Sequence, residues 1–429
     1  MRRGTSWVIA AIAAITSAAL ANGRPPLANG VRFKPGDPNA VYVATTFGLL
    51  VSPDACHFYW LCEQDIGYGG EFDPQYGVTA AGTILATTFQ GLRISRDGGC
   101  SFTPALAGLY TTGLAVGPTS DVWVGTSESG SANAIYVSHD DAQTLDPVGG
   151  LPGTMWYPSL AVAPSAPGRV YVAAYALSGT TMPPTSHWFR TDDGGASWIE
   201  LPVTAIAFAS SPSLVIGAIA PADPDTAFVI SRLANPPYGD RVYRTRDAGA
   251  TLTEVAATTS SITGLVVRDA SRVEIATSST GMLESTDGGA TFAPLATTLQ
   301  FGCLGQRGDG TLFACASDYD PDDMALGSSP DARSWTTLLR FEFLTGTVDC
   351  PSGTVERDVC DGELWRGLTQ QIGEGSASTC ASGPDGPMPE LPRDGAARSG
   401  GCCDVAPPSQ SASLALIVGW LLRRRRHNR

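Results

Sequence analysis

The sequence predicts an all-β protein, a seven-bladed β-propeller with four-stranded blades. An eight-residue pattern, Ser/Thr-x-Asp-x-Gly-x-Ser/Thr-aromatic, recurs in complete and eroded copies whose aspartates are Asp54, Asp97, Asp140, Asp193, Asp247, Asp287 and Asp331. Successive copies begin 40 to 54 residues apart, near the roughly 40–45 residues of a propeller blade. Short runs of β-branched and aromatic residues, divided by Gly and Pro, separate the copies, as an antiparallel meander requires. Seven copies therefore predict seven blades.

The same order of short apolar runs precedes each copy of the pattern. In the third period, runs at 113–117, 121–125 and 134–137 come before the copy that begins at Ser138. An Asp carboxylate can accept backbone N–H bonds across a tight turn, and Gly supplies a positive φ. We therefore expect the pattern to be a structural turn between the third and fourth strands. All copies would mark one face of the propeller, and the long insertions would fall on the opposite face, here called the insertion face.

The complete copy at 285–292, Ser-Thr-Asp-Gly-Gly-Ala-Thr-Phe, resembles the Asp-box (BNR) repeat of sialidases, sortilin-type receptors and photosystem assembly factors. The resemblance implies either an enzyme or a binding propeller. Sialidases carry an Arg-Ile-Pro motif near the start, and the nearest match, Leu92-Arg93-Ile94-Ser95, lacks the proline. Endoglucanases with this repeat usually use two propellers. We therefore expect a non-catalytic binding module for an extracellular glycan or protein, with a glycoside hydrolase acting on extracellular polysaccharide as the alternative.

The amino-terminal end predicts export. Residues 1–21 combine Arg2 and Arg3, an apolar run and small residues before Asn22, which is the pattern of a secretory signal peptide. The formal net charge of the chain is −14. An acidic surface repels nucleic acid, so no nucleic-acid partner is expected.

The carboxyl-terminal end, residues 402–429, contains Cys402 and Cys403, an apolar run and four consecutive arginines. It resembles the C-terminal sorting tail of myxobacterial surface proteins. That resemblance implies modification at one of these cysteines, partners in a sorting protease or translocation machinery, and membrane contact only through the tail. The protein would then lie at the cell surface or outer membrane, or be released. Residues 367–401, rich in Gly, Ser and Pro, are expected to form a flexible stalk, which assigns 22–366 to the propeller.

Apart from Cys402 and Cys403, the chain has eight cysteines, an even number that predicts disulfides in an exported protein. Cys303 and Cys315 flank one expected hairpin, and Cys350 and Cys360 flank a short loop. Pairing within each of these two sets is plausible. The partners of the remaining four cannot be deduced from sequence.

Two sets of residues on the insertion face are candidates for binding. Aromatic side chains suit sugars or extended peptides, and the candidate ligand face consists of Trp60, Tyr68, Trp156, Tyr157, Tyr238 and Tyr319; packing of loops onto the propeller is the alternative. The acidic loop with Asp318, Asp320 and Asp322 is the best candidate for Ca²⁺, which prefers carboxylate oxygens, although a solvated acidic loop would read the same way. No other cofactor and no catalytic residue is assigned.

Overall fold

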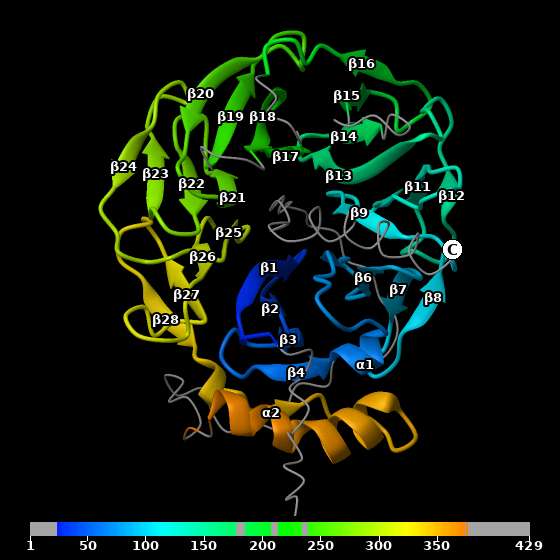
Figure 1. Cartoon of the computed structure of the whole chain (residues 1–429), viewed down its shortest axis with the longest axis vertical. Helices are drawn as coiled ribbons and strands as arrows, with labels where there is room; N and C mark the ends of the chain where they lie inside the picture. The colour runs from blue at the N-terminus through cyan, green and yellow to red at the C-terminus, as the bar shows by residue number, and fades with distance from the viewer. Residues whose placement is uncertain (1–23, 177–184, 207–212, 234–238, 374, 376–429) are drawn as a thin grey trace, which may run out of the picture.

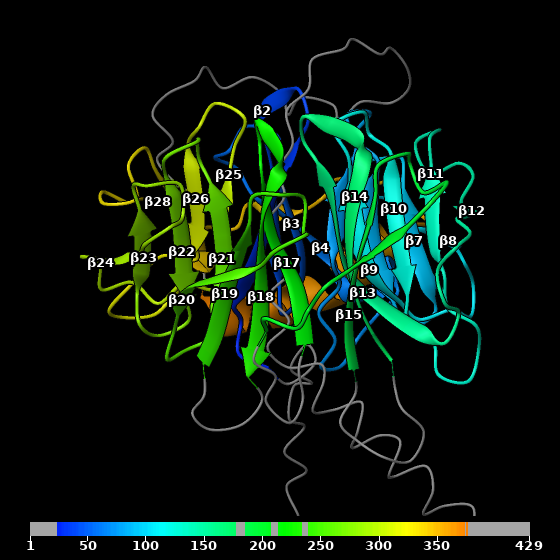
Figure 2. The same cartoon turned by 90° about the horizontal axis from the view of Figure 1, so that it is seen from above.

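The computed structural model describes residues 24–176, 185–206, 213–233, 239–373 and 375. Seven sheets stand in a ring (Figure 1), each built on four consecutive antiparallel strands, and the first also carries a fifth strand from near the carboxyl-terminal end of the described chain. This arrangement confirms the predicted seven-bladed propeller. Seen edge-on, the strands run between two opposite faces (Figure 2). The expected signal peptide, the expected sorting tail with Cys402 and Cys403, and residues 376–401 of the expected stalk lie outside the described residues.

The blades follow one another in chain order. Blade 1 is formed by β1 (Ala28–Lys34), β2 (Asp37–Thr45), β3 (Gly48–Ser52) and β4 (Tyr59–Cys62). Blade 2 is formed by β5 (Tyr76–Val78), β6 (Ile84–Thr88), β7 (Gly91–Ser95) and β8 (Thr103–Ala105). Blade 3 is formed by β9 (Thr111–Val116), β10 (Val122–Thr126), β11 (Ile135–Ser138) and β12 (Asp146–Pro147). Blades 4 and 5 are formed by β13 (Met155–Ala163), β14 (Ala166–Ala176), β15 (Thr185–Thr191) and β16 (Ile199–Leu201); and β17 (Ser213–Ala220), β18 (Asp223–Leu233), β19 (Gly239–Thr245) and β20 (Thr253–Ala257).

Blades 6 and 7 complete the ring, and short helical elements accompany blade 1. The strands are β21 (Ile262–Val267), β22 (Val273–Thr277), β23 (Met282–Ser285) and β24 (Ala293–Leu295); and β25 (Cys303–Gln306), β26 (Leu312–Cys315), β27 (Leu326–Ser329) and β28 (Thr336–Leu339). A short helix, α1 (Glu63–Ile66), follows β4. After blade 7 come the 3-10 turn η1 (Phe341–Phe343), β29 (Gly346–Thr347), the π-helix η2 (Glu356–Leu364) and α2 (Trp365–Ile372).

The burial of each strand depends on its place in the blade. The second strands β6, β10 and β22 are buried at every residue, because neighbouring blades cover both of their sides. Their sequences are accordingly continuous runs rich in Val, Ile and Thr rather than alternating ones. The fourth strands β8, β12 and β24 are short and mostly exposed. This gradient places the apolar core between blades and leaves the rim to polar residues.

The seven copies of the repeated pattern form seven equivalent turns between the third and fourth strands. In the sixth, Asp287 accepts the hydroxyl of Ser285 at 2.7 Å, the amide of Thr291 at 3.0 Å and the Thr291 hydroxyl at 2.7 Å. The Ser/Thr-to-Asp hydrogen bond recurs in the other six turns at 2.7 to 3.2 Å. Gly288 and Gly289 have positive φ, at 71° and 74°. Each carboxylate thus satisfies donors that its turn would otherwise leave unpaired.

Arginines connect successive turns around this face. Arg96, Arg190, Arg244 and Arg268 each donate from the guanidinium to a backbone carbonyl in the turn of the following blade; the acceptors are Asp141, Ala248, Gly288 and Pro330. A guanidinium offers five donors in a rigid fork. It can therefore bond to a neighbouring carbonyl and still contact its own blade. These bonds link blades 2 to 3, 4 to 5, 5 to 6 and 6 to 7.

The two ends of the ring meet without sharing a strand. Blade 1 uses only β1 to β4, and β1 lies beside blade 7, where the rings of Phe33 and Phe313 meet edge-on at 4.8 Å between centroids. The chain then continues as the C-terminal strap, defined as residues 346–372. β29 pairs in parallel with β4, with Gly346 opposite Tyr59, and α2 lies outside the ring beside β4 (Figure 1).

Two disulfides fasten this strap to the propeller. Cys62 of β4 is bonded to Cys360, and Cys100 of blade 2 to Cys350. The expected Cys350–Cys360 pairing is therefore wrong. The stretch between these two cysteines includes part of η2, and each cysteine pairs with a different blade. The Cys303–Cys315 disulfide was predicted correctly, because these residues lie opposite each other on β25 and β26. Cys56 is also disulfide-bonded.

The packed structure extends past the expected boundary at residue 366. α2 runs from Trp365 to Ile372, with Leu368 buried in the same cluster as Trp60. The first residues assigned to the stalk are therefore part of a helix. No helix within the described ranges is long and apolar enough to span a membrane.

Removing the Cys100–Cys350 disulfide by paired Ser substitutions should lower the free energy of unfolding by roughly 2–5 kcal/mol, because the crosslink joins distant segments and limits the unfolded chain. The sequence separation is 250 residues, against 12 for Cys303–Cys315. Urea denaturation of both double variants would test this. An equal or greater loss in the Cys303/Cys315 variant would contradict the dominance of the long-range crosslink.

Asp193→Asn should lower the melting temperature at neutral pH and by less in acid. Hydrogen bonds from the Ser197 hydroxyl and amide hold the pKa of Asp193 at about 2, below its ordinary 3.8. Because the folded-state pKa is depressed, this stabilisation is present above about pH 4 and lost as pH falls through about 2. Calorimetry at about pH 7 and pH 2.5 would measure both effects, with Asp146→Asn on the exposed β12 as the control. Identical pH profiles for the wild-type protein and Asp193→Asn would argue against the assigned role.

Candidate functional site

Three of the predicted ligand-face aromatics are buried. Trp60 lies on β4 beneath the strap, where its indole donates to the Phe47 carbonyl at 2.8 Å and its ring lies 6.0 Å from that of Trp365. Trp156 and Tyr157 belong to β13, and the Tyr157 hydroxyl donates to the Pro152 carbonyl at 2.6 Å. The burial of these three side chains favours packing, the alternative stated for this set, over contact with a ligand. These side chains pack against the strands from which the loops extend.

The other three predicted aromatics differ in their surroundings. Tyr68 is half-buried and its hydroxyl accepts a hydrogen bond from Tyr76 at 3.1 Å. Tyr319, in the loop between β26 and β27, is 50% exposed. Tyr238 lies outside the described residues. Among the five described candidates, Tyr319 is the most exposed.

The acidic loop uses two of its carboxylates to hold backbone. Asp318 is buried and accepts the amide of Phe341 at 3.1 Å, and burial raises the pKa of Asp318 to about 6. Asp322 accepts the amides of Gln300 at 3.0 Å and Ser317 at 3.4 Å. Asp320 precedes Pro321. Within the described ranges, these three carboxylates do not gather into a group that could hold one metal ion, so the geometry gives the expected Ca²⁺ site no support.

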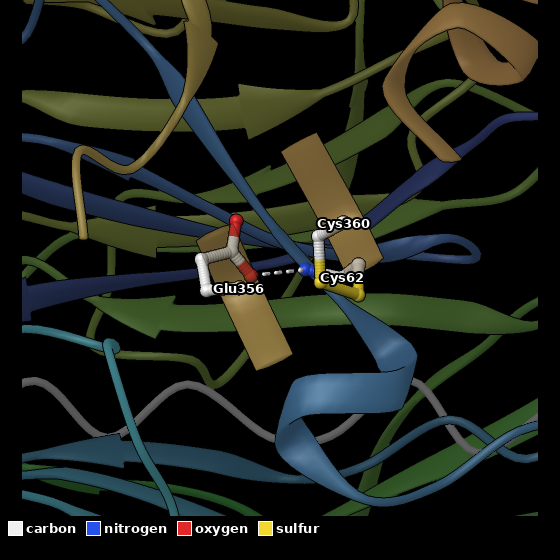
Figure 3. A group of neighbouring side chains, drawn as sticks. All are labelled: Cys62, Glu356 and Cys360. Atoms are coloured by element: carbon white, nitrogen blue, oxygen red, sulfur yellow. Dashed lines mark hydrogen bonds between the residues drawn. A yellow bond between two sulfur atoms is a disulfide. The ribbon is translucent and has the colours of Figure 1, made fainter. Parts of the chain in front are cut away.

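One cluster of cysteines and a carboxylate does meet the distance requirement for a metal site. It consists of Cys62, Glu356 and Cys360, whose ligand atoms lie within 4.8 Å of one another (Figure 3). The two sulfurs are joined in a disulfide. Metal binding by cysteine requires thiolates, so this group is a covalent crosslink with a carboxyl beside it.

The insertion face carries an aromatic platform that the sequence analysis did not identify, formed by Phe72, Phe89 and Tyr110. Phe89 stacks on Tyr110 at 4.5 Å between centroids and 25° between planes, and its ring lies 4.5 Å from that of Phe72 at a tilt of 47°. Phe72 and Tyr110 are buried, whereas Phe89 is 53% exposed. The sequence signal was an aromatic residue within the two-residue turn between β6 and β7, where Thr88 pairs with Gly91.

Polar contacts fix the loop beneath this platform. Arg24 binds both carboxylate oxygens of Asp73, at 2.9 and 3.0 Å, and donates to the Phe72 carbonyl at 3.3 Å. Glu128 accepts the amide of Tyr110 at 3.1 Å. A bidentate arginine restricts rotation more than a single contact does. Phe72 and Tyr110 are therefore held in place from the backbone, and Phe89 rests on a preformed surface.

Comparisons with known proteins do not assign a family. No family model matches, and no curated protein matches. Many solved structures are similar to this chain, and three of them serve as examples. The GH74 xyloglucanase from Xanthomonas campestris is 13% identical over 73% of this chain and 71% of that chain, with a TM-score of 0.38. YCF48 from Cyanidioschyzon merolae is 15% identical over 69% of this chain and 94% of that chain, with a TM-score of 0.45. A puromycin-hydrolyzing peptidase from Mycobacterium tuberculosis is 15% identical over 76% of this chain and 48% of that chain, with a TM-score of 0.46. At these identities and TM-scores they carry no argument about function.

Phe72→Ala should destabilise the protein by about 3–5 kcal/mol, the usual range for truncating a buried phenylalanine. Phe89→Ala should change stability by less than about 1 kcal/mol, because half of its ring is already in water. Urea denaturation of the two variants would separate a supporting residue from a presented one. A large loss of stability in Phe89→Ala would show that Phe89 serves packing instead.

Proposed function

We propose that this chain is an exported, surface-displayed propeller of the Asp-box type that binds an extracellular glycan or protein through its insertion face without catalysis. The observation that carries the proposal is the exposed ring of Phe89 on its buried aromatic support. A flat ring that is already ordered offers contact area at a small entropic penalty, which suits a pyranose ring or an apolar peptide side chain.

A neighbouring turn supports this reading. The turns after β2 and β6 each have two central residues and the same Thr-to-Gly carbonyl hydrogen bond, at 2.9 and 2.7 Å. Each contains one phenylalanine. Phe47, in the first turn, is 3% exposed because Phe341 packs edge-on against it at 5.1 Å. Phe89, in the second, is 53% exposed. An aromatic side chain of this chain covers the first ring, and a partner would cover the second.

The proposed location rests on sequence alone. The signal-peptide pattern of residues 1–21 supports export, and the Cys402-Cys403 tail with its arginine cluster supports sorting to the cell surface or release there. Under this proposal the stalk places the propeller away from the membrane, and the sorting machinery contacts only the tail.

The binding proposal predicts that Phe89→Ala weakens ligand capture by about 10-fold or more, the usual effect of removing a central aromatic anchor. The exported protein would be screened on a glycan array and against extracellular protein extracts, and the affinity of each hit would be measured for both forms. Ile199→Ala is the matched control, because Ile199 is 49% exposed on the rim strand β16. Equal affinity for the wild-type protein and Phe89→Ala would exclude the platform as the binding surface.

One observation favours the alternative, a glycoside hydrolase. Asp318 precedes the exposed Tyr319, and burial raises the pKa of Asp318 to about 6. The guanidinium of Arg340 contacts the carboxylates of Asp318, Asp323 and Glu342 at 3.9, 3.3 and 3.2 Å. A hydrolase needs one protonated and one ionised carboxyl, and this group contains candidates for both. Turnover of a polysaccharide that is abolished in Asp318→Asn and retained in Phe89→Ala would establish the alternative and overturn the non-catalytic proposal.

A further inference from the structure

The junction between the C-terminal strap and blade 1 contains a buried carboxyl group that is only partly satisfied. Glu356, at the start of η2, is 0% exposed and accepts the amide of Cys62 at 3.3 Å through Oε2 (Figure 3). Its Oε1 has no hydrogen-bond partner within the described part of the chain. A buried ionised carboxylate needs a full set of partners, so this geometry favours the protonated form.

A second buried carboxyl lies close by on α1. Asp65 is 8% exposed, and its Oδ2 also lacks a hydrogen-bond partner among the described residues. Burial raises the pKa of Glu356 to about 8, with a further increase from the charge of Asp65, and burial raises the pKa of Asp65 to about 7. An ionised Asp65 therefore disfavours the ionisation of Glu356 while both remain buried.

Most of the charged groups described around this pair are acidic. Glu63 of α1 is buried, Asp97 in the turn of blade 2 raises the pKa of Asp65, and Asp361 of η2 raises that of Glu356. Of the nearby cations, Arg357 is bound to Asp361 at 2.8 Å. Arg93 of β7 packs its guanidinium against Gly67, where an added Cβ would meet it at 2.9 Å.

A cation is the other way to satisfy two buried carboxyls, and the arrangement does not favour it. Within the described ranges, the only groups that gather near Glu356 at metal-ligand spacing are Cys62 and Cys360. Their sulfurs are consumed in the disulfide. Ca²⁺ takes six to eight oxygen ligands, so two carboxyls without a third would form a poor site. A proton is the simpler occupant.

We propose that the strap is a proton-dependent latch: it packs tightly on blade 1 while Glu356 and Asp65 hold protons, and it loosens when they ionise. The Cys62–Cys360 and Cys100–Cys350 disulfides keep the loosened strap tethered to the ring. No covalent step is involved. The trigger is mildly alkaline surroundings, which an exported protein meets directly.

The direction of the pH effect follows from the raised pKa values of the folded protein. A carboxyl whose pKa is raised on folding stabilises the packed form fully at pH values below its unfolded-state pKa, and this stabilisation is lost as the pH rises through its folded-state pKa. For Glu356 the stabilisation is lost over the pH range from 4.5 to about 8. The strap should therefore be most protected in mild acid and least protected above about pH 8.

Hydrogen exchange of the full exported chain, with its disulfides intact, tests the latch. Protection factors for 356–372, corrected for intrinsic exchange, should fall between about pH 5 and pH 8, by up to about tenfold per pH unit for each of the two carboxyls that ionises, and then level off. Those of β22 should change less. Glu356→Gln mimics the protonated form and should keep the strap protected across the range, and Asp65→Asn should reduce the decline. The fluorescence of Trp365, which packs near Trp60, gives a second readout.

The matched control is Glu254→Gln, because Glu254 is an exposed partner of Arg241 on β20 of blade 5, away from blade 1. This variant should keep the wild-type pH profile. A flat wild-type profile, or an unchanged decline in Glu356→Gln, would overturn the proposal. Recovery of protection at about pH 9 on adding CaCl₂, in the wild-type protein and not in Glu356→Gln, would overturn it in favour of a cation site.

Discussion

The hydrogen bonds from each repeat-turn carboxylate to its own turn determine the rest of the architecture. The two oxygens of the Asp287 carboxylate accept two amides and two hydroxyls, which closes a tight turn between the third and fourth strands. Because the turn backbone is fixed, its carbonyls lie in a constant position, and arginines such as Arg244 can bond across to the next blade. Local turn chemistry thus becomes a tie between blades.

Closing the ring requires a different solution, because each blade is built from consecutive strands. Packing such as Phe33 against Phe313 joins the first and last blades directly. The chain that leaves blade 7 then pairs β29 with β4, the outer strand of blade 1, and the strap beyond it is crosslinked to blades 1 and 2. The carboxyl-terminal segment therefore fastens the two ends of the ring together.

The repeat could be predicted from sequence because its chemistry is local: the Asp, the hydroxyls and the glycines of each turn lie within eight residues. The strap could not be predicted, because Cys350 and Cys360 pair with partners 250 and 298 residues away. Proximity in the chain favoured the wrong pair. Trp60 was assigned to the candidate ligand face for a related reason. Its position before a long loop suggested exposure, yet the strap returns from the far end of the chain to cover it.

Phe89 was missed because a two-residue turn gave no sign of an insertion, and length was the criterion for the binding face. The physical difference between Phe47 and Phe89 lies in what covers them, which no local pattern encodes. Strand order nevertheless predicted which connections lie on which face of the propeller, because the connections of a meander alternate between its two ends. The repeat turns and their arginine ties use one face for cohesion. That leaves the insertion face freer to vary, and an ordered, half-exposed aromatic ring is found there.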